Sequence, residues 1–254
     1  MQQLTDRIAV VTGAASGIGL GIAQAFADSG MTVMMTDVDE ERLQREVAGI
    51  GTDRAAGMVC DVADLVAVEV LADETFERFG AVHVVCNNAG IIRGGSVWEL
   101  PLTDWEAVLG VNLWGVLHGI RSFVPRMLAA GTEGHVVNVA SMAAVVPVAG
   151  IGPYSVAKHG VLALSETLDM ELRAAGAPIG VTVVFPGRVP SRLGRPIDSP
   201  DEPAASTLEP GVVAAEDIGR MVVDAVVDQR MFLFTHPERI AEVEQRFARI
   251  TANP

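Results

Sequence analysis

The chain has 254 residues, a formal net charge of −14 at pH 7, and a composition that is 50% hydrophobic but only 5% aromatic. This length suits one large α/β domain, and a core built mainly from small aliphatic side chains is typical of a parallel sheet covered by helices on both faces. A strongly acidic chain is a poor match for nucleic acid, whose phosphates attract positive charge.

The sequence also bears on compartment and redox state. No secretory leader is visible before the first expected strand, and no apolar run reaches membrane-spanning length without interruption. We therefore expect a cytoplasmic protein without membrane contact. Cys60 and Cys86 each end an apolar run, which predicts two buried thiols rather than a disulfide or a metal site.

Short β-rich runs alternate with longer segments of helical periodicity along the chain. The expected strands are Arg7–Thr12, Met31–Asp37, Ala56–Asp61, Val82–Asn87, His135–Ala140, Gly180–Phe185 and Met231–Thr235. The expected helices are Gly17–Ser29, Glu40–Ala48, Leu65–Phe79, Thr103–Ala129, Tyr154–Ala175 and Ala215–Gln229. Regular β-α alternation implies right-handed crossovers. The prediction is a single-domain Rossmann fold, with a doubly wound parallel sheet of about seven strands and helices on both faces.

Two local patterns add detail to this fold. Thr103 followed by Glu106 predicts a capping box at the start of the longest helix. The stretch from about 187 to 213 is rich in proline, serine and charged residues. Long irregular segments in compact domains are usually functional, so we expect a substrate lid there, within one domain spanning residues 1–254.

The first expected strand runs into a glycine-rich turn that opens a helix. Such a turn lets the backbone approach a pyrophosphate, and the free N–H groups of the helix start favour an anion. The residues expected there are Gly13, Ser16, Gly17, Ile18 and Gly19. Asp37 ends the second strand, where a carboxylate can accept hydrogen bonds from ribose hydroxyls and repel a 2′-phosphate. Because neither Ala15 nor Val38 is basic, the sequence favours NAD over NADP.

Tyr154 is the only tyrosine in the chain, and Lys158 follows it by one helical turn. On a helix, this spacing places the phenol and the ammonium group on the same face. A fixed cation favours the phenolate and lowers the pKa of the phenol. The pair therefore predicts a tuned acid/base, although the spacing alone also fits an ordinary surface helix.

Several further motifs stand in order around this pair. They are the turn Thr12–Gly19, Asp61–Val62 after the third strand, Asn87–Gly90 after the fourth, Asn112 within the long helix, Ser141 after the fifth strand, and Pro186–Gly187 after the sixth. With these motifs, the chain resembles the classical short-chain dehydrogenase/reductase family from Arg7 to about Val189. Among the chain's departures from the family pattern, His83 replaces a common aspartate and is expected to be structural, and Ser191 replaces a common threonine.

The resemblance implies a catalytic set. Tyr154 is the general acid in ketone reduction and the base in alcohol oxidation, and Lys158 lowers its pKa and binds the nicotinamide ribose. Ser141 holds the reacting oxygen of the substrate, and Asn112 anchors a water in a proton relay. The implied cofactor contacts, besides the glycine-rich turn and Asp37, are Asp61, Val62, Asn88, Ala89, Gly90, Tyr154, Lys158, Pro186, Gly187, Val189 and Ser191.

The substrate region combines apolar and basic residues. We expect Ser141, Met142, Val145 and Tyr154 to contact the substrate, and the small apolar stretch from Met142 to Pro153 favours an apolar ketone or secondary alcohol. Arg188, Arg192 and Arg195, with Arg93 at the rim, either dock an anionic substrate or belong to a solvated loop.

These observations predict an NAD(H)-dependent oxidoreductase that interconverts a secondary alcohol and a ketone. One alternative is a 3-oxoacyl-thioester reductase, and another is a catalytically silent NAD(H)-binding regulator on the same fold. The apolar helices Thr103–Ala129 and Tyr154–Ala175 predict burial against other subunits, and the resemblance points to a homotetramer, or else a homodimer. The competing explanation is that segment Pro237–Ile250 covers these helices within one chain.

Overall fold

The computed structural model describes residues 1, 3–194 and 211–252, and confirms the expected Rossmann-like single domain. One parallel sheet has the strand order β3-β2-β1-β4-β5-β6-β7. The strands are β1 (Ile8–Thr12), β2 (Thr32–Asp37), β3 (Ala55–Val59), β4 (Val84–Asn87), β5 (Gly134–Val139), β6 (Ile179–Phe185) and β7 (Phe232–Phe234). The expected strand boundaries agree with these to within two residues.

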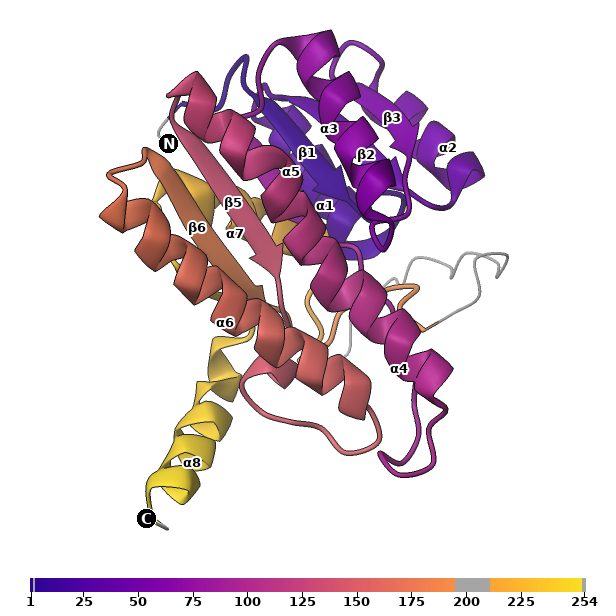
Figure 1. Cartoon of the computed structure of the whole chain (residues 1–254), viewed down its shortest axis with the longest axis vertical. Helices are drawn as coiled ribbons and strands as arrows, with labels where there is room; N and C mark the ends of the chain where they lie inside the picture. Colours follow the sequence, from indigo (N-terminus) through magenta and orange to yellow (C-terminus); the bar gives the residue numbers. More distant parts are fainter. Residues whose placement is uncertain (2, 195–210, 253–254) are drawn as a thin grey trace.

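Helices cover both faces of the sheet (Figure 1). One face carries α3 (Leu65–Phe79), α5 (Gly115–Ala130) and α6 (Gly152–Ala174), while α1 (Gly17–Asp28) and α7 (Ala215–Val227) pack together on the other. The helix α2 (Glu40–Ile50) lies beside β2 and β3.

Two hydrophobic cores follow from this layering. Along β1, Val10 faces the core under α3, α5 and α6, whereas Ala9 and Val11 face the core under α1 and α7. Successive strand residues point to opposite faces, so a strand covered on both sides must be apolar throughout. This explains why the central strands read as continuous apolar runs.

The longest predicted helix is continuous but not uniform. It comprises α4 (Leu102–Leu109), a π-helical turn η1 (Gly110–Trp114), and α5. The predicted capping box is wrong: Pro101 is the N-cap residue, it makes no side-chain cap, and Thr103 lies inside the first turn. By length and composition alone, the stretch Leu102–Ala130 could cross a membrane, but half of its most apolar window is buried within the chain, as expected for a core helix.

The C-terminal segment forms a short helical turn, η3 (Pro237–Arg239), followed by α8 (Ile240–Thr251). None of the residues of α8 is buried, and the helix extends away from the body of the molecule (Figure 1). Arg246 attaches it by a hydrogen bond from Nη1 to the Val145 carbonyl oxygen, at 2.8 Å. Segment Pro237–Ile250 therefore does not pack over the apolar helices as a covering layer.

The strand order reverses between β1 and β4, because the chain builds outward through β2 and β3 and then returns to the other side of β1. In open α/β sheets, the crevice beyond the carboxyl ends of the strands at such a switch point is the usual ligand site. Most of the motifs predicted from the sequence follow these strand ends, while Asn112 lies in the long helix and Tyr154 and Lys158 lie in α6.

Candidate active site

A cavity of about 690 Å³ lies at this switch point. Its wall brings together most of the residues expected to contact the cofactor. They are Gly13, Ser16, Gly17, Ile18, Asp37, Asp61, Val62, Asn88, Ala89, Gly90, Tyr154, Lys158, Pro186, Gly187, Val189 and Ser191. Gly19 is not part of the wall, because it packs beneath the turn, against the Gly13 carbonyl and the Asn88 side chain.

The turn between β1 and α1 leaves N–H groups available at the cavity. Ser16 is the N-cap residue but makes no side-chain cap, and the first turn of α1 contains no acidic residue. The helix start thus keeps its partial positive charge and unsatisfied donors. Gly13 and Gly17 have φ angles of +64° and +54°, a conformation that favours glycine. This arrangement is suited to bind a diphosphate.

Hydrogen bonds lock this turn to the one after β4. The Thr12 hydroxyl oxygen accepts from the backbone N–H groups of Asn88 and Ala89, both at 3.0 Å. In return, Asn88 Nδ2 donates to the carbonyl oxygens of Thr12 and Gly13, at 2.9 and 3.2 Å. A Cβ atom on Gly13 would lie 2.8 Å from the Ala89 Cα. The two turns therefore form one rigid wall.

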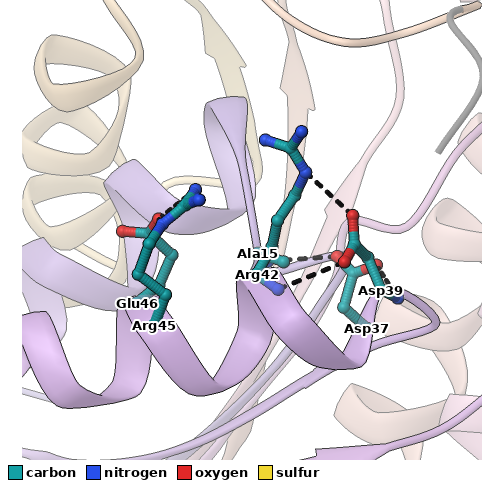
Figure 2. A network of polar contacts seen from close by, with 6 residues as sticks. All are labelled: Ala15, Asp37, Asp39, Arg42, Arg45 and Glu46. Carbon is teal, nitrogen blue, oxygen red and sulfur yellow. Dashed lines mark hydrogen bonds and ion pairs between the residues drawn. The ribbon is translucent and has the colours of Figure 1, made fainter. Parts of the chain in front are cut away.

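Asp37 belongs to a polar network at one end of the cavity (Figure 2). Its carboxylate accepts hydrogen bonds from the N–H groups of Ala15 and Asp39, at 3.0 and 3.1 Å. Asp39 caps α2 through the Arg42 N–H and also forms an ion pair with Arg42 Nε at 2.8 Å. The Arg42 side chain lines the cavity, a contact that sequence reasoning missed. The sequence signal that could have identified Arg42 is its position as a basic residue in the first turn of α2, shortly after Asp37 ends β2.

The predicted acid/base residues line the same cavity. Ser141 follows β5 and caps the short helical turn η2 (Met142–Ala144). Its hydroxyl lies close enough to Tyr154, near the start of α6, to favour the phenolate and oppose the effect of burial on the pKa of Tyr154. Lys158 lies one turn further along α6, with Nζ 5.7 Å from the centre of the Tyr154 ring and 2.8 Å from the Val139 carbonyl oxygen, to which it donates. Ser141, Tyr154 and Lys158 thus meet at one side of the cavity.

Burial governs the ionisation of this pair. Tyr154 is 8% exposed and Lys158 is 3% exposed, so each charged form is poorly solvated. Burial raises the pKa of Tyr154, against the opposing effect of the Ser141 hydrogen bond, and lowers the pKa of Lys158 to about 8. The sequence predicted a lowered pKa for Tyr154. In the chain itself the direction is reversed, because desolvation outweighs the stabilisation of the phenolate.

Asn112 occupies the π-helical turn and is fully buried. Its Oδ1 accepts from the Ile91 N–H and its Nδ2 donates to the Ile91 carbonyl oxygen, both at 2.8 Å. These bonds offset the cost of burying an amide. Asn112 is not part of the cavity wall, but Ile91 and Val111 are. Its contribution visible in the structure is to fix the loop after β4; the predicted role in a proton relay stays a prediction.

The substrate residues divide into two groups. Met142 and Val145 are 2% and 5% exposed and belong to a hydrophobic core instead of the cavity wall, because the turn η2 directs them inward. Arg188, Arg192 and Arg93 do line the cavity. Arg195 lies outside the described residues, as does most of the predicted lid.

The structure also explains His83 and the two cysteines. His83 Nδ1 accepts a hydrogen bond from the Ile8 N–H at 3.0 Å and so joins the start of β4 to β1, which is the structural role expected. Cys60 and Cys86 are buried free thiols, as predicted. Burial raises the pKa of Cys60 to about 11, so this thiol stays protonated although it lies at the cavity.

Comparisons with known proteins identify the family of the chain. The family profile described as short chain dehydrogenase matches residues 7–202. The chain is 39% identical to a 1-deoxy-11-beta-hydroxypentalenate dehydrogenase of Streptomyces exfoliatus, over 96% of this chain and 88% of that protein. A short-chain dehydrogenase/reductase from Burkholderia phymatum, solved in complex with NAD, superposes with a TM-score of 0.91 at 35% identity, covering 99% of this chain and 96% of that one. The chain is therefore an oxidoreductase acting on CH–OH groups, and it belongs to the classical short-chain dehydrogenase/reductase family.

Proposed function

We propose that this protein interconverts a secondary alcohol and a ketone with NAD(H), using Tyr154 as the general acid and base. The observation that carries the proposal is that Ser141, Tyr154 and Lys158 line the same cavity as the uncapped helix start at Ser16. Two hydroxyl groups, of which that of Tyr154 is on a buried residue, beside a buried cation suit the alkoxide charge that develops on a carbonyl oxygen during reduction.

The residues present fit a dinucleotide. Gly13, Ser16 and Gly17 would hold the diphosphate at the α1 start, Asp37 would accept from the adenosine ribose, and Lys158 would bind the nicotinamide ribose. When bound, the cofactor supplies or accepts the hydride. Val62 and Val189 add apolar surface to the wall.

The protein supplies the proton and the orientation. In the direction of reduction, the Tyr154 hydroxyl donates its proton to the substrate oxygen, while the Ser141 hydroxyl donates a hydrogen bond to the same oxygen. The raised pKa of Tyr154 keeps it protonated for this step. Alcohol oxidation needs the phenolate, so its rate is expected to rise with pH. Lys158, held by the Val139 carbonyl, places a proton donor next to Tyr154.

The decisive test is Tyr154→Phe, which removes one oxygen and leaves the ring. We expect kcat to fall by at least about a hundredfold, the scale of general acid–base catalysis, while the affinity for NADH changes little. Kinetics and NADH fluorescence titration measure the two effects separately. Ser141→Ala is the companion variant and should also lower kcat at unchanged NADH affinity. Substantial turnover by Tyr154→Phe would refute the proposed acid/base.

For the cofactor, we propose NAD(H) in preference to NADP(H). Asp37 lines the cavity, and its carboxylate is fixed by two N–H groups at the end of β2. Arg42, the basic side chain at this end, is paired with Asp39. A 2′-phosphate beside Asp37 would be repelled. The measurement is kcat/KM with each cofactor, and equal or better use of NADP(H) would sink this preference.

For the substrate, we propose an apolar secondary alcohol or ketone that carries a carboxylate. Three arginines, Arg93, Arg188 and Arg192, lie on the same cavity as Tyr154, in a protein of net charge −14. Arginine binds carboxylates through paired N–H groups. Moreover, the name of the Streptomyces exfoliatus relative describes a hydroxylated carboxylate as its substrate.

A matched pair of substrates tests this class. A hydroxy acid should be oxidised with a lower KM than its methyl ester. Arg93→Gln should reduce the difference, because the Arg93 guanidinium lies at the cavity, where it makes a 3.7 Å contact with Asp104 and donates to the Ile92 carbonyl oxygen. If acid and ester are used equally well, the arginines do not dock a substrate anion. An acyl-thioester substrate would show instead as a preference for thioesters over both.

We also propose that the protein assembles as a homotetramer through the α4–α5 helix and α6. Trp114, Val156 and Met170 are at least half exposed on these elements. Large exposed apolar side chains on neighbouring helices are typical of subunit interfaces. Light scattering gives the assembly state directly, and a monomer would contradict this assignment.

A further inference from the structure

His236 is a buried histidine that belongs to none of the predicted motifs and bonds the backbone of two residues that line the cavity. His236 directly follows Thr235 at the end of β7, is 1% exposed, and has hydrogen-bond partners on both ring nitrogens. Nδ1 lies 3.0 Å from the Gly187 backbone nitrogen and 2.7 Å from the Thr235 hydroxyl. Nε2 lies 3.2 Å from the Arg188 carbonyl oxygen.

These partners determine the form of the ring. The Gly187 N–H can only donate, so Nδ1 must carry a lone pair, and the Arg188 carbonyl can only accept, so Nε2 must carry the proton. His236 is therefore held as the neutral Nε2–H tautomer. In this form it bonds two successive backbone groups of the segment Pro186–Val189, which lines the cavity.

The same segment is held from two other sides. The Pro186 carbonyl oxygen accepts from the Met142 N–H at 2.9 Å, immediately after Ser141, and the Arg188 carbonyl oxygen also accepts from the Val213 N–H at 3.1 Å. A Cβ atom on Gly187 would lie 2.7 Å from His236 Cγ, so the ring packs directly against the backbone. Three consecutive residues of the wall are thus fixed by β7, by the loop after β5, and by the entry to α7.

From this geometry we infer that His236 is a positioning residue, which sets the Gly187–Arg188 backbone so that the cavity wall facing Ser141 and Tyr154 has the shape required by the nicotinamide half of NAD(H). The inference rests on the proposed cofactor. It does not involve the adenosine end, because Asp37 and Ala15 are fixed independently by their own hydrogen bonds. A defect at His236 should therefore affect the two halves of the cofactor unequally.

The test compares His236→Leu with His236→Asn, two side chains of nearly the same shape. Asparagine retains an acceptor for the Gly187 N–H close to the Nδ1 position, whereas leucine offers none. We expect the leucine variant to bind NADH about tenfold more weakly and to have a lower kcat, because small misplacements at a reacting centre are costly. The affinity for ADP-ribose, which lacks the nicotinamide, should be unchanged, and His236→Asn should restore most of the NADH affinity.

His135→Leu provides the control for loss of a buried histidine. His135 is fully buried at the opposite end of the sheet, where Nε2 bonds the Thr182 hydroxyl at 2.7 Å. This variant should lose thermal stability and keep its NADH affinity at a temperature where it is folded. Equal loss of NADH and ADP-ribose binding in His236→Leu, unchanged NADH binding, or identical behaviour of the leucine and asparagine variants would each overturn the inference. None of these outcomes bears on whether Tyr154 is the acid/base, which Tyr154→Phe tests separately.

Discussion

The two ends of the cavity are made rigid in different ways. At the end formed by β1, β2 and β4, Thr12, Asp37 and Asn88 belong to the motifs themselves and bond the backbone of neighbouring turns. At the end formed by β6, the wall Pro186–Arg188 carries few bonding side chains of its own and is fixed from outside by Met142, His236 and Val213. The first end contains its own supports, while the second depends on the rest of the fold.

The largest effect is expected where the first end is most tightly packed. Gly19→Ala would place a Cβ atom against the Gly13 carbonyl, with Asn88 Nδ2 at only 2.5 Å. Because the two turns are locked together, neither can move away cheaply. We expect NADH binding to weaken by more than about a hundredfold, corresponding to roughly 3 kcal/mol or more, and the protein to unfold at a lower temperature. Fluorescence titration and thermal unfolding measure these effects.

Gly49→Ala is the matched control for that substitution. Gly49 lies within α2, and a Cβ atom there would meet nothing within 4 Å. Alanine in a helix is favoured over glycine by roughly 0.5–1 kcal/mol, so this variant should be slightly more stable and bind NADH normally. If both variants bound NADH equally well and were equally stable, the close packing of the two turns would not be the reason for glycine at position 19.

A smaller effect, confined to the same end, is expected from Asp37→Ser. Removing the carboxylate should shift the ratio of kcat/KM for NADP(H) over NAD(H) upward by about a hundredfold, because repulsion of the 2′-phosphate is lost and Arg42 lies on the same wall. Asp39→Asn is the control: asparagine can still cap α2, but the ion pair with Arg42 is removed. If Asp39→Asn shifted the preference as much as Asp37→Ser, Arg42 would be the determinant.

The contrast between the two ends of the cavity also explains which parts of the fold and the site could be predicted from the sequence. The sheet, the glycine-rich turn, Asp37 and the Tyr154–Lys158 pair were predictable because each is encoded by local periodicity or by residues of fixed spacing. His236 was not, since a single histidine after a strand has no pattern, and its partners lie in another loop. Met142 and Val145 were misplaced because a short helical turn after Ser141 directs them into the core, which their apolar character alone could not reveal.

The lowered pKa of Lys158 predicts how the free energy of unfolding changes with pH. Its folded pKa of about 8 lies below that of an ordinary lysine, so burial of the cation is destabilising below pH 8. As pH rises from about 8 to 10.5, the folded protein loses this proton before the unfolded chain does, and stability increases. Lys158→Met should not show this increase in stability, because methionine has no proton to lose. The free energy of unfolding of the wild type, measured relative to Lys158→Met, should rise by about 2 kcal/mol between pH 8 and 10.

Denaturant unfolding at several pH values checks the expected slope. Each variant is compared with itself across the series, so the loss of the hydrogen bond to Val139 cancels. A flat difference between the two proteins would mean that Lys158 remains charged throughout this range. The same series with bound NADH would show whether the cofactor raises the pKa again by bringing polar groups to the buried ammonium.

The smallest effect is expected at Thr103, which lies outside both ends of the cavity and was predicted to cap the long helix. As a capping residue, Thr103 would contribute about 1 kcal/mol, which Thr103→Ala would remove. In the structure Thr103 is exposed inside the first turn of α4, so the substitution should change the free energy of unfolding by less than about 0.5 kcal/mol. Asp39→Ala is the positive control, because Asp39 does accept the Arg42 N–H and cap α2, and it should lose roughly 1 kcal/mol. Urea unfolding of both variants ranks them directly. If Thr103→Ala cost as much as Asp39→Ala, Thr103 would be the N-cap residue in solution, and α4 would begin at Asp104 instead of Leu102.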